Sequence, residues 1–209
     1  MPDKKYEIAH RETLFQGYFR IDRFRLRHER FQGDWSDFFT REVFQQSGRF
    51  AAVLPYDPKS DKVMLIEQFR AGVLAGGEYP WITEAVAGLI DGGETPEQAA
   101  RREAREEAGC AIFELQKIAD YFSSPGCTAE HITLFAGRTV APPDGAIHGV
   151  PHEHENIRVR ALDAAQAISL LYAGKIRDGL TLIALQWFAM HHTDLRSRWM
   201  VSDVGTPII

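Results

Sequence analysis

Residues 88–110 read GLIDGGETPEQAARREAREEAGC, and this stretch decides the fold because both ends of a helix can be recognised in it. Thr95 occupies the expected N-cap, Pro96 the first helical position, and Gln98 the position three residues after the cap, a combination typical of a capping box. Gly109 suits the left-handed residue that ends many helices. The pattern therefore predicts a helix from Pro96 up to the residue before Gly109.

Three glutamates share one face of this predicted helix. At about 100° per residue, Glu103, Glu106 and Glu107 fall within one arc of its surface. Their mutual repulsion and the negative end of the helix dipole both disfavour this arrangement. A divalent cation would relieve the repulsion, and a site of carboxylate oxygens suits Mg²⁺ or Mn²⁺. The helix alone also allows a solvated face of Glu–Arg pairs, in which Arg102 simply pairs with Glu106.

The wider spacing favours the metal site. From Gly88 the chain has five residues, Glu94, seven residues, and then REAREEAGC at residues 102–110. This order resembles the Nudix box, G-x5-E-x7-R-E-U-x-E-E-x-G-U, in which U is apolar. All seven polar and glycine positions match, and small residues fill the apolar positions. The resemblance implies that Glu94 and Arg102 form a structural pair joining the loop to the helix.

The resemblance also implies a fold and a set of metal ligands. The fold would be the Nudix fold of the α/β (α+β) class, a mixed sheet sandwiched between helices. Glu103 and Glu107 would be the leading ligands of divalent metals held against a pyrophosphate. The backbone carbonyl of Ala87 would be a further ligand, and Glu106 would lie in or beside the coordination shell among the catalytic residues.

Four other segments are similar to bacterial ADP-ribose pyrophosphatases within that family. They are TREVF at 40–44, IEQFR at 66–70, SSPGCTAE at 123–130 and IHGVPHEHENIRV at 147–159. The implied reaction is hydrolysis of ADP-ribose to AMP and ribose 5-phosphate with two or three Mg²⁺ ions, Mn²⁺ being the alternative. Another nucleoside diphosphate sugar, such as GDP-mannose, is a second candidate substrate. A non-catalytic ADP-ribose sensor is a third possibility, disfavoured because the box is intact.

A long connection is predicted over residues 141–156, and loops of this length are usually functional or disordered. Without the resemblance, Glu153 and Glu155 would be two solvated acids in it. By resemblance Glu153 is the general base and Glu155 a further metal contact. The flanking His152 and His154 leave an alternative base open. A base on such a loop would let closure exclude bulk water.

Four residues elsewhere are candidates for binding the substrate. Arg41 and Arg70 offer bidentate cationic contacts for phosphate or the terminal ribose. By resemblance Glu130 contacts a ribose hydroxyl. Tyr18 is a candidate for stacking on adenine.

Composition bounds the class of protein. The 209 residues carry a formal net charge of -5, which argues against nucleic acid or an anionic membrane as the main partner. Cys110 and Cys127 lack C-x-x-C spacing and are expected to be reduced, buried thiols. No apolar run reaches ~18 residues, and the first ten residues lack a signal peptide's apolar core, so a cytoplasmic protein is expected.

The chain is expected to divide after residue 48. Residues 6 to about 48 alternate apolar, aromatic and charged types, which predicts an extra N-terminal antiparallel sheet within the unit 1–48. Such a sheet is marginal alone, and by resemblance it is exchanged within a homodimer. In the hydrolase domain, 49–209, the pattern predicts strands at 49–57, 62–70, 83–90, 116–122, 131–139 and 157–161, helices at 164–173 and 180–191, and a loose tail at 202–209.

Overall fold

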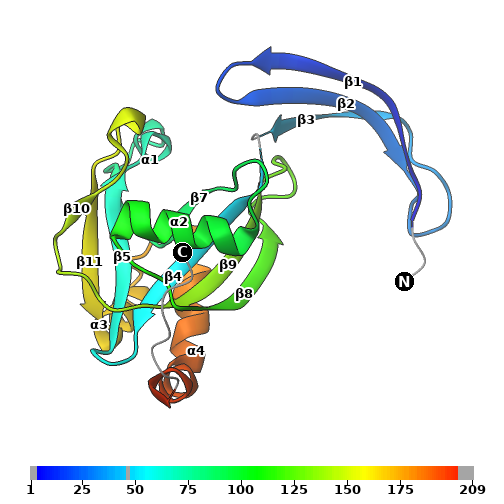
Figure 1. Cartoon of the computed structure of the whole chain (residues 1–209). Coiled ribbons are helices and arrows are strands. Elements are labelled where there is room, and N and C mark those ends of the chain that lie inside the picture. The colour runs from blue at the N-terminus through cyan, green and yellow to red at the C-terminus, as the bar shows by residue number, and fades with distance from the viewer. Residues whose placement is uncertain (1–3, 46–47, 202–209) are drawn as a thin grey trace. The chain divides into compact units, whose positions relative to one another are not determined.

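The computed structural model describes residues 4–45 and 48–201, which fall into two compact units (Figure 1). Among the described residues, the N-terminal unit comprises 4–45, 48–49 and 122–131, and the main unit comprises 50–121 and 132–201. The place of 122–131 in the N-terminal unit was not predicted from the sequence. The tail predicted at 202–209 lies outside the described residues.

The N-terminal unit is built on a three-stranded antiparallel sheet, as its alternating sequence predicts. The strands are β1 (Tyr6–Gln16), β2 (Arg20–His28) and β3 (Phe39–Gln45), in the order β1-β2-β3. Every residue of β1 is exposed. Asp22 on β2 is an exception, because it is fully buried. Its carboxylate accepts hydrogen bonds from Arg11 and Thr13.

The main unit is organised around one mixed sheet. Its strands are β4 (Phe50–Asp57), β5 (Lys62–Phe69), β6 (Trp81–Glu84), β7 (Val86–Leu89), β8 (Glu114–Phe122), β9 (His131–Arg138), β10 (Ile147–His148) and β11 (Ile157–Asp163). The order is β10-β11-β5-β4-β9-β8, with β6 paired to β5 and β7 paired to β4. β4 runs parallel to β9 and antiparallel to β5 and β7, so the predicted mixed sheet is confirmed.

Helices cover both faces of this sheet (Figure 1). The helices are α1 (Ala71–Ala75), α2 (Pro96–Ala108), α3 (Ala164–Tyr172) and α4 (Gly179–Val201), with the short 3-10 helix η1 (Pro151–Glu153). Alternate residues of β4 serve opposite faces. Ala51 and Val53 pack in the core under α2, whereas Leu54 and Tyr56 pack in the core under α3 and α4. The predicted α/β (α+β) sandwich is confirmed.

Two expectations, about the strand 83–90 and the connection 141–156, need correction. The strand predicted at 83–90 is two strands, because the chain changes partner at Ala85 from β5 to β4. The connection 141–156 is not structureless, since it contains β10 and η1 and its Gly145 and Ala146 pair with Val159.

The last helix is also longer than predicted. The prediction ended it at His191, but Leu195 and Trp199 remain on the buried face and carry the helix on to Val201. The short helix α1 was not predicted at all. Among the described residues no helix is both long and apolar enough to cross a membrane.

The expectation that both cysteines are buried is half wrong. Cys110 is buried, but Cys127 is exposed. Cys127 lies in the turn after Ser124, to whose carbonyl its backbone N–H donates a hydrogen bond.

Candidate active site

The predicted ends of α2 are confirmed. The Oγ1 of Thr95 accepts a hydrogen bond from the backbone N–H of Gln98 at 3.2 Å, and the Gln98 side chain accepts one from the Thr95 N–H at 2.8 Å. Gly109 ends the helix with φ 62°. These boundaries fix the rotational positions of the acidic residues between them.

Arg102 joins the helix to the loop that precedes it. Its Nε donates to Glu94 Oε1 at 3.0 Å, and its Nη2 donates to the Leu89 carbonyl at 2.8 Å. The hydrogen bonds from Arg102 lower the pKa of Glu94. The expected structural pair is therefore present, and it holds β7, the loop and the helix together.

The same guanidinium also faces two acids of the helix. Its Nη1 donates to Glu103 Oε1 at 2.7 Å and to Glu106 Oε2 at 3.1 Å. The pairing of Arg102 with Glu106 that the helix alone allowed is therefore real. It coexists with the cluster of acids and does not replace it.

Glu107 is the most buried of the helix acids. Only 3% of it is exposed, and its Oε2 accepts a hydrogen bond from the Ala87 N–H at 3.1 Å. Burial, reinforced by the negative charge of Glu103, raises the pKa of Glu107 to about 8. Burial also raises the pKa of Glu103. Two carboxyl groups thus lie side by side where negative charge is poorly solvated.

Small residues allow this close packing. Ala100, Ala104 and Ala108 are fully buried and let α2 lie close to the sheet. On the facing strand, a Cβ atom on Gly88 would lie 1.8 Å from Oε1 of Glu103. Glu103 therefore fills the space that a larger residue at Gly88 would need.

The loop acid Glu155 acts on the acids of α2. The Oε2 of Glu155 accepts a hydrogen bond from the Val150 N–H at 2.9 Å. The negative charge of Glu155 contributes to the raised pKa of both Glu103 and Glu107, so it acts on the helix acids. Glu153 is the last residue of η1, and its side chain lies outside what the structure describes.

The arrangement fits a divalent cation by chemistry. The acids supply only carboxylate oxygens, the donors that Mg²⁺ and Mn²⁺ prefer. Within the described ranges they do not form a ready-made group of three or more ligands. Arg102 donates hydrogen bonds to Glu103 and Glu106. Backbone N–H groups donate hydrogen bonds to Glu107 and Glu155. A bound cation would have to replace some of these internal partners.

Arg70 lies near this cluster and is held by a residue that sequence analysis missed. Its Nε donates to Glu84 Oε2 at 2.7 Å, and its positive charge offsets only part of the rise that burial causes in the pKa of Glu107. Glu84 is 8% exposed, and burial raises its pKa. The available signal was a lone acid inside the apolar run 82–90.

The other three predicted substrate contacts belong to the N-terminal unit. Tyr18 is 89% exposed and makes an edge-to-face contact with Phe19. The guanidinium of Arg41 stacks over the Phe39 ring at 4.7 Å. Glu130 lies in the segment that joins this unit, and its N–H donates to a nearby threonine. Their roles in binding substrate stay predictions.

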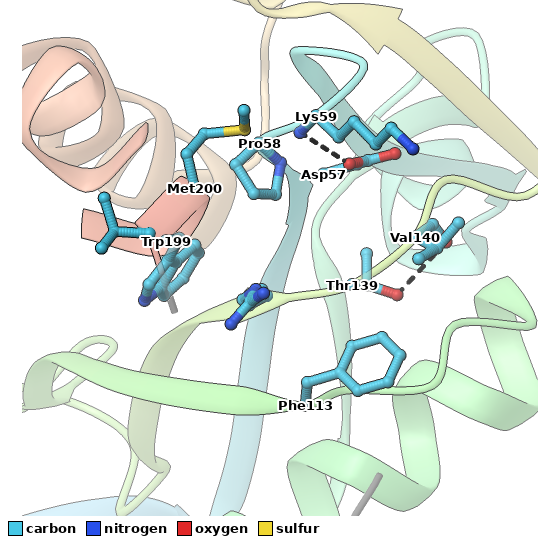
Figure 2. A pocket seen from close by; sticks show the side chains of 10 residues that line it. Asp57, Pro58, Lys59, Phe113, Thr139, Val140, Trp199 and Met200 are labelled. Carbon is cyan, nitrogen blue, oxygen red and sulfur yellow. Dashed lines mark hydrogen bonds between the residues drawn. The ribbon is translucent and has the colours of Figure 1, made fainter. Parts of the chain in front are cut away.

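The main unit also contains a cavity of about 420 Å³ that none of the predicted residues lines (Figure 2). It lies between the β4–β5 turn, the end of β9 and the end of α4. Asp57 on its wall is saturated by hydrogen bonds from Ser60 Oγ and from the backbone N–H groups of Lys59, Ser60 and Ala141. Its carboxylate therefore has a structural role.

Comparison with known proteins agrees with this geometry. The NUDIX domain model matches residues 47–181, well over half of the chain. The chain is 42% identical over 193 residues to the ADP-ribose pyrophosphatase of Escherichia coli (strain K12), covering 92% of each protein. It is 37% identical over 153 residues to the GDP-mannose pyrophosphatase of Escherichia coli O1:K1 / APEC, covering 73% of this chain and 78% of the relative.

A solved structure described as an ADP compounds hydrolase has the same fold. The two structures superpose with a TM-score of 0.66 at 19% sequence identity, over 90% of this chain and 96% of the other. At that identity the similarity speaks for the fold alone.

Proposed function

This chain belongs to the Nudix family, and from that premise we propose that it hydrolyses the pyrophosphate bond of ADP-ribose to give AMP and ribose 5-phosphate. The observation that carries the proposal is the complete box folded so that the buried Glu107 lies beside Glu103 on α2. The relative that matches along 92% of both proteins is an ADP-ribose pyrophosphatase, whereas the GDP-mannose pyrophosphatase matches along 73% of this chain.

The acids of α2 and the loop would hold the metal. We assign Glu103, Glu107, Glu155 and the backbone carbonyl of Ala87 as ligands of two or three Mg²⁺ ions, with Mn²⁺ as a substitute. Glu106, half-exposed beside Arg102, would lie in or next to the coordination shell. When bound, such ions neutralise the pyrophosphate and lower the pKa of a coordinated water.

The chain's own residues would then orient the substrate and deprotonate the attacking water. Glu153 is assigned as the base that accepts the proton of the attacking water, and His152 or His154 is the alternative. Arg70, aimed by its ion pair with Glu84, would contact a phosphate oxygen or the terminal ribose. Closure of the segment that carries Glu153 would exclude bulk water during hydrolysis.

The N-terminal unit would be exchanged between the two chains of a homodimer. Its sheet exposes every residue of β1 and large apolar side chains such as Tyr6, Phe15 and Tyr18. A three-stranded sheet with so little core of its own gains stability by packing on a partner. Light scattering on the purified protein in solution should give a molar mass twice that of the 209-residue chain.

A cytoplasmic location is also part of the proposal. Both cysteines are free thiols, and the exposed Cys127 would be prone to oxidation outside a reducing compartment.

A substrate panel tests the reaction. With Mg²⁺ present, kcat/KM for ADP-ribose should exceed that for GDP-mannose and for ADP-hexoses by at least about tenfold, a difference of ~1.4 kcal/mol in transition-state binding. A higher value for GDP-mannose would transfer the assignment to that substrate. Binding of ADP-ribose without hydrolysis of any member of the panel would favour a sensor.

A further inference from the structure

The ring of His148 lies directly against the glycine that ends α2. A Cβ atom on Gly109 would meet Cε1 of His148 at 2.6 Å and Nε2 at 2.8 Å, closer than such contacts occur in proteins. The φ of 62° at Gly109 independently favours glycine. Gly109 therefore both ends the helix and leaves room for the imidazole ring.

Backbone contacts fix His148 from two sides. The N–H of Gly149 donates to the carbonyl of Glu106 at 3.1 Å, one of the last carbonyls of α2, which lack partners within the helix. On the other side, β10 pairs with β11 so that His148 stands opposite the fully buried Ile157. The segment is thus clamped between the helix and the edge of the sheet.

The segment held in this way contacts Glu155 directly. Gly149 has φ 107°, and a Cβ atom there would lie 2.7 Å from Cβ of Glu155. The next residue, Val150, donates its N–H to Glu155 Oε2 at 2.9 Å. A short run of contacts therefore connects Gly109, through His148 and Gly149, to the loop acid.

We propose that His148 is a positioning residue, whose ring, packed on Gly109, holds Glu155 and its loop against the acids of α2. It acts through another residue and need not touch substrate. The inference rests on the proposed function in one respect, that Glu155 takes part in the reaction. Its structural half does not depend on any activity.

Amide hydrogen exchange in the metal-free protein tests the structural half. His148→Ala should speed exchange of the Gly149 and Val150 amides by about tenfold or more, because opening of the clamp becomes easier. Ile147→Ala is the matched control. Ile147 is 59% exposed and is the preceding residue of β10, so its side chain points to the opposite face. The control should change the two rates by less than about twofold.

A double-mutant cycle tests the functional half. In the wild-type background, Glu155→Gln should lower kcat by about tenfold or more, and in the His148→Ala background by less than about threefold. KM for ADP-ribose should stay within about threefold in His148→Ala, since substrate binding is not the step affected. A residue that matters only for stability would leave the cost of Glu155→Gln unchanged, and that outcome overturns the positioning role.

Gly109→Ala probes the same contact from the helix side, in case His148→Ala unfolds. The added methyl group should displace the ring and speed exchange of the same two amides. If wild-type protein fails to hydrolyse ADP-ribose, the proposed function falls while the exchange result stands. If the Gly149 and Val150 amides exchange in His148→Ala as they do in Ile147→Ala, the inference is wrong even in a fully active enzyme.

Discussion

Gly88 and Glu103 occupy the same space: a Cβ atom on Gly88 would lie 1.8 Å from Oε1 and 2.0 Å from Cδ of Glu103. Strand β7 and helix α2 therefore approach each other so closely that only glycine admits the Glu103 carboxylate in its observed position. The first residue of the box and its central acid, fifteen positions apart, are one steric unit. The spacing of the motif has a physical cause in this contact.

Gly88→Ala should displace the Glu103 carboxylate and lower kcat by about 100-fold with Mg²⁺, since one preorganised charged group is lost. The fold should survive, because a side chain can turn away. Gly92→Ala is the matched control, since a Cβ atom there meets nothing within 4 Å. Equal activity of the two variants would show that the Glu103 position is unimportant.

Glu107→Gln should separate activity from stability. The carboxyl group is 3% exposed and burial raises its pKa to about 8. At neutral pH the folded metal-free protein therefore loses stability whether the group stays charged or takes up a proton, and the neutral amide removes that cost. Activity should fall by about 100-fold or more, while the Tm in EDTA stays equal to that of wild type or rises. A Tm lower by several degrees would mean that Glu107 supports the fold.

Arg102→Lys should destabilise the protein by about 1–3 kcal/mol in urea unfolding. An ammonium cannot serve Glu94, the Leu89 carbonyl and Glu103 at once, as the planar guanidinium does. Arg105→Lys, at an exposed position of the same helix, should cost less than about 0.5 kcal/mol. Similar losses in the two variants would refute the joining role of Arg102.

Much of this site follows from the sequence because local rules decide it. The caps at Thr95 and Gly109 fix α2, and its period places the acids. The exception is Glu84, whose importance comes from a partner fourteen residues away in sequence. The order of residues in one strand carries no record of that pairing.

The misses among the secondary-structure elements have a similar origin. The break at Ala85 arises because β6 and β7 pair with different strands. The extension of α4 beyond His191 depends on burial of Trp199 in the core, which polar neighbours conceal. Tertiary contacts determine both the break in the strand and the length of the helix, and local propensity does not reveal such contacts.

Asp57→Asn should destabilise the main unit by about 1–3 kcal/mol near neutral pH, because a saturated acceptor loses charge and one of its oxygens. Burial raises the pKa of Asp57, but the hydrogen bonds outweigh it and the pKa is lowered from 3.8. Stability from this carboxylate is therefore present above the unfolded pKa and disappears as pH falls through the folded pKa.

The difference in the free energy of unfolding between wild type and Asp57→Asn should accordingly stay constant near neutral pH and shrink below about pH 4. Denaturant unfolding at several pH values measures it. Asp163→Asn serves as the control, because that aspartate is largely exposed and pairs with Lys62 at the surface. If the difference in unfolding free energy does not depend on pH, the effect of the substitution comes from the shape of the side chain and not from its charge.

Calorimetric titration of Mg²⁺ or Mn²⁺ in the presence of a non-hydrolysable ADP-ribose analogue tests the central claim most directly. Wild-type protein and Glu97→Gln, changed at an exposed position of α2, should take up the ion with the same affinity. Glu107→Gln should bind it at least about tenfold more weakly. Absence of uptake by wild type, or equal affinity in all three proteins, would contradict the assignment of α2 as the metal-binding helix.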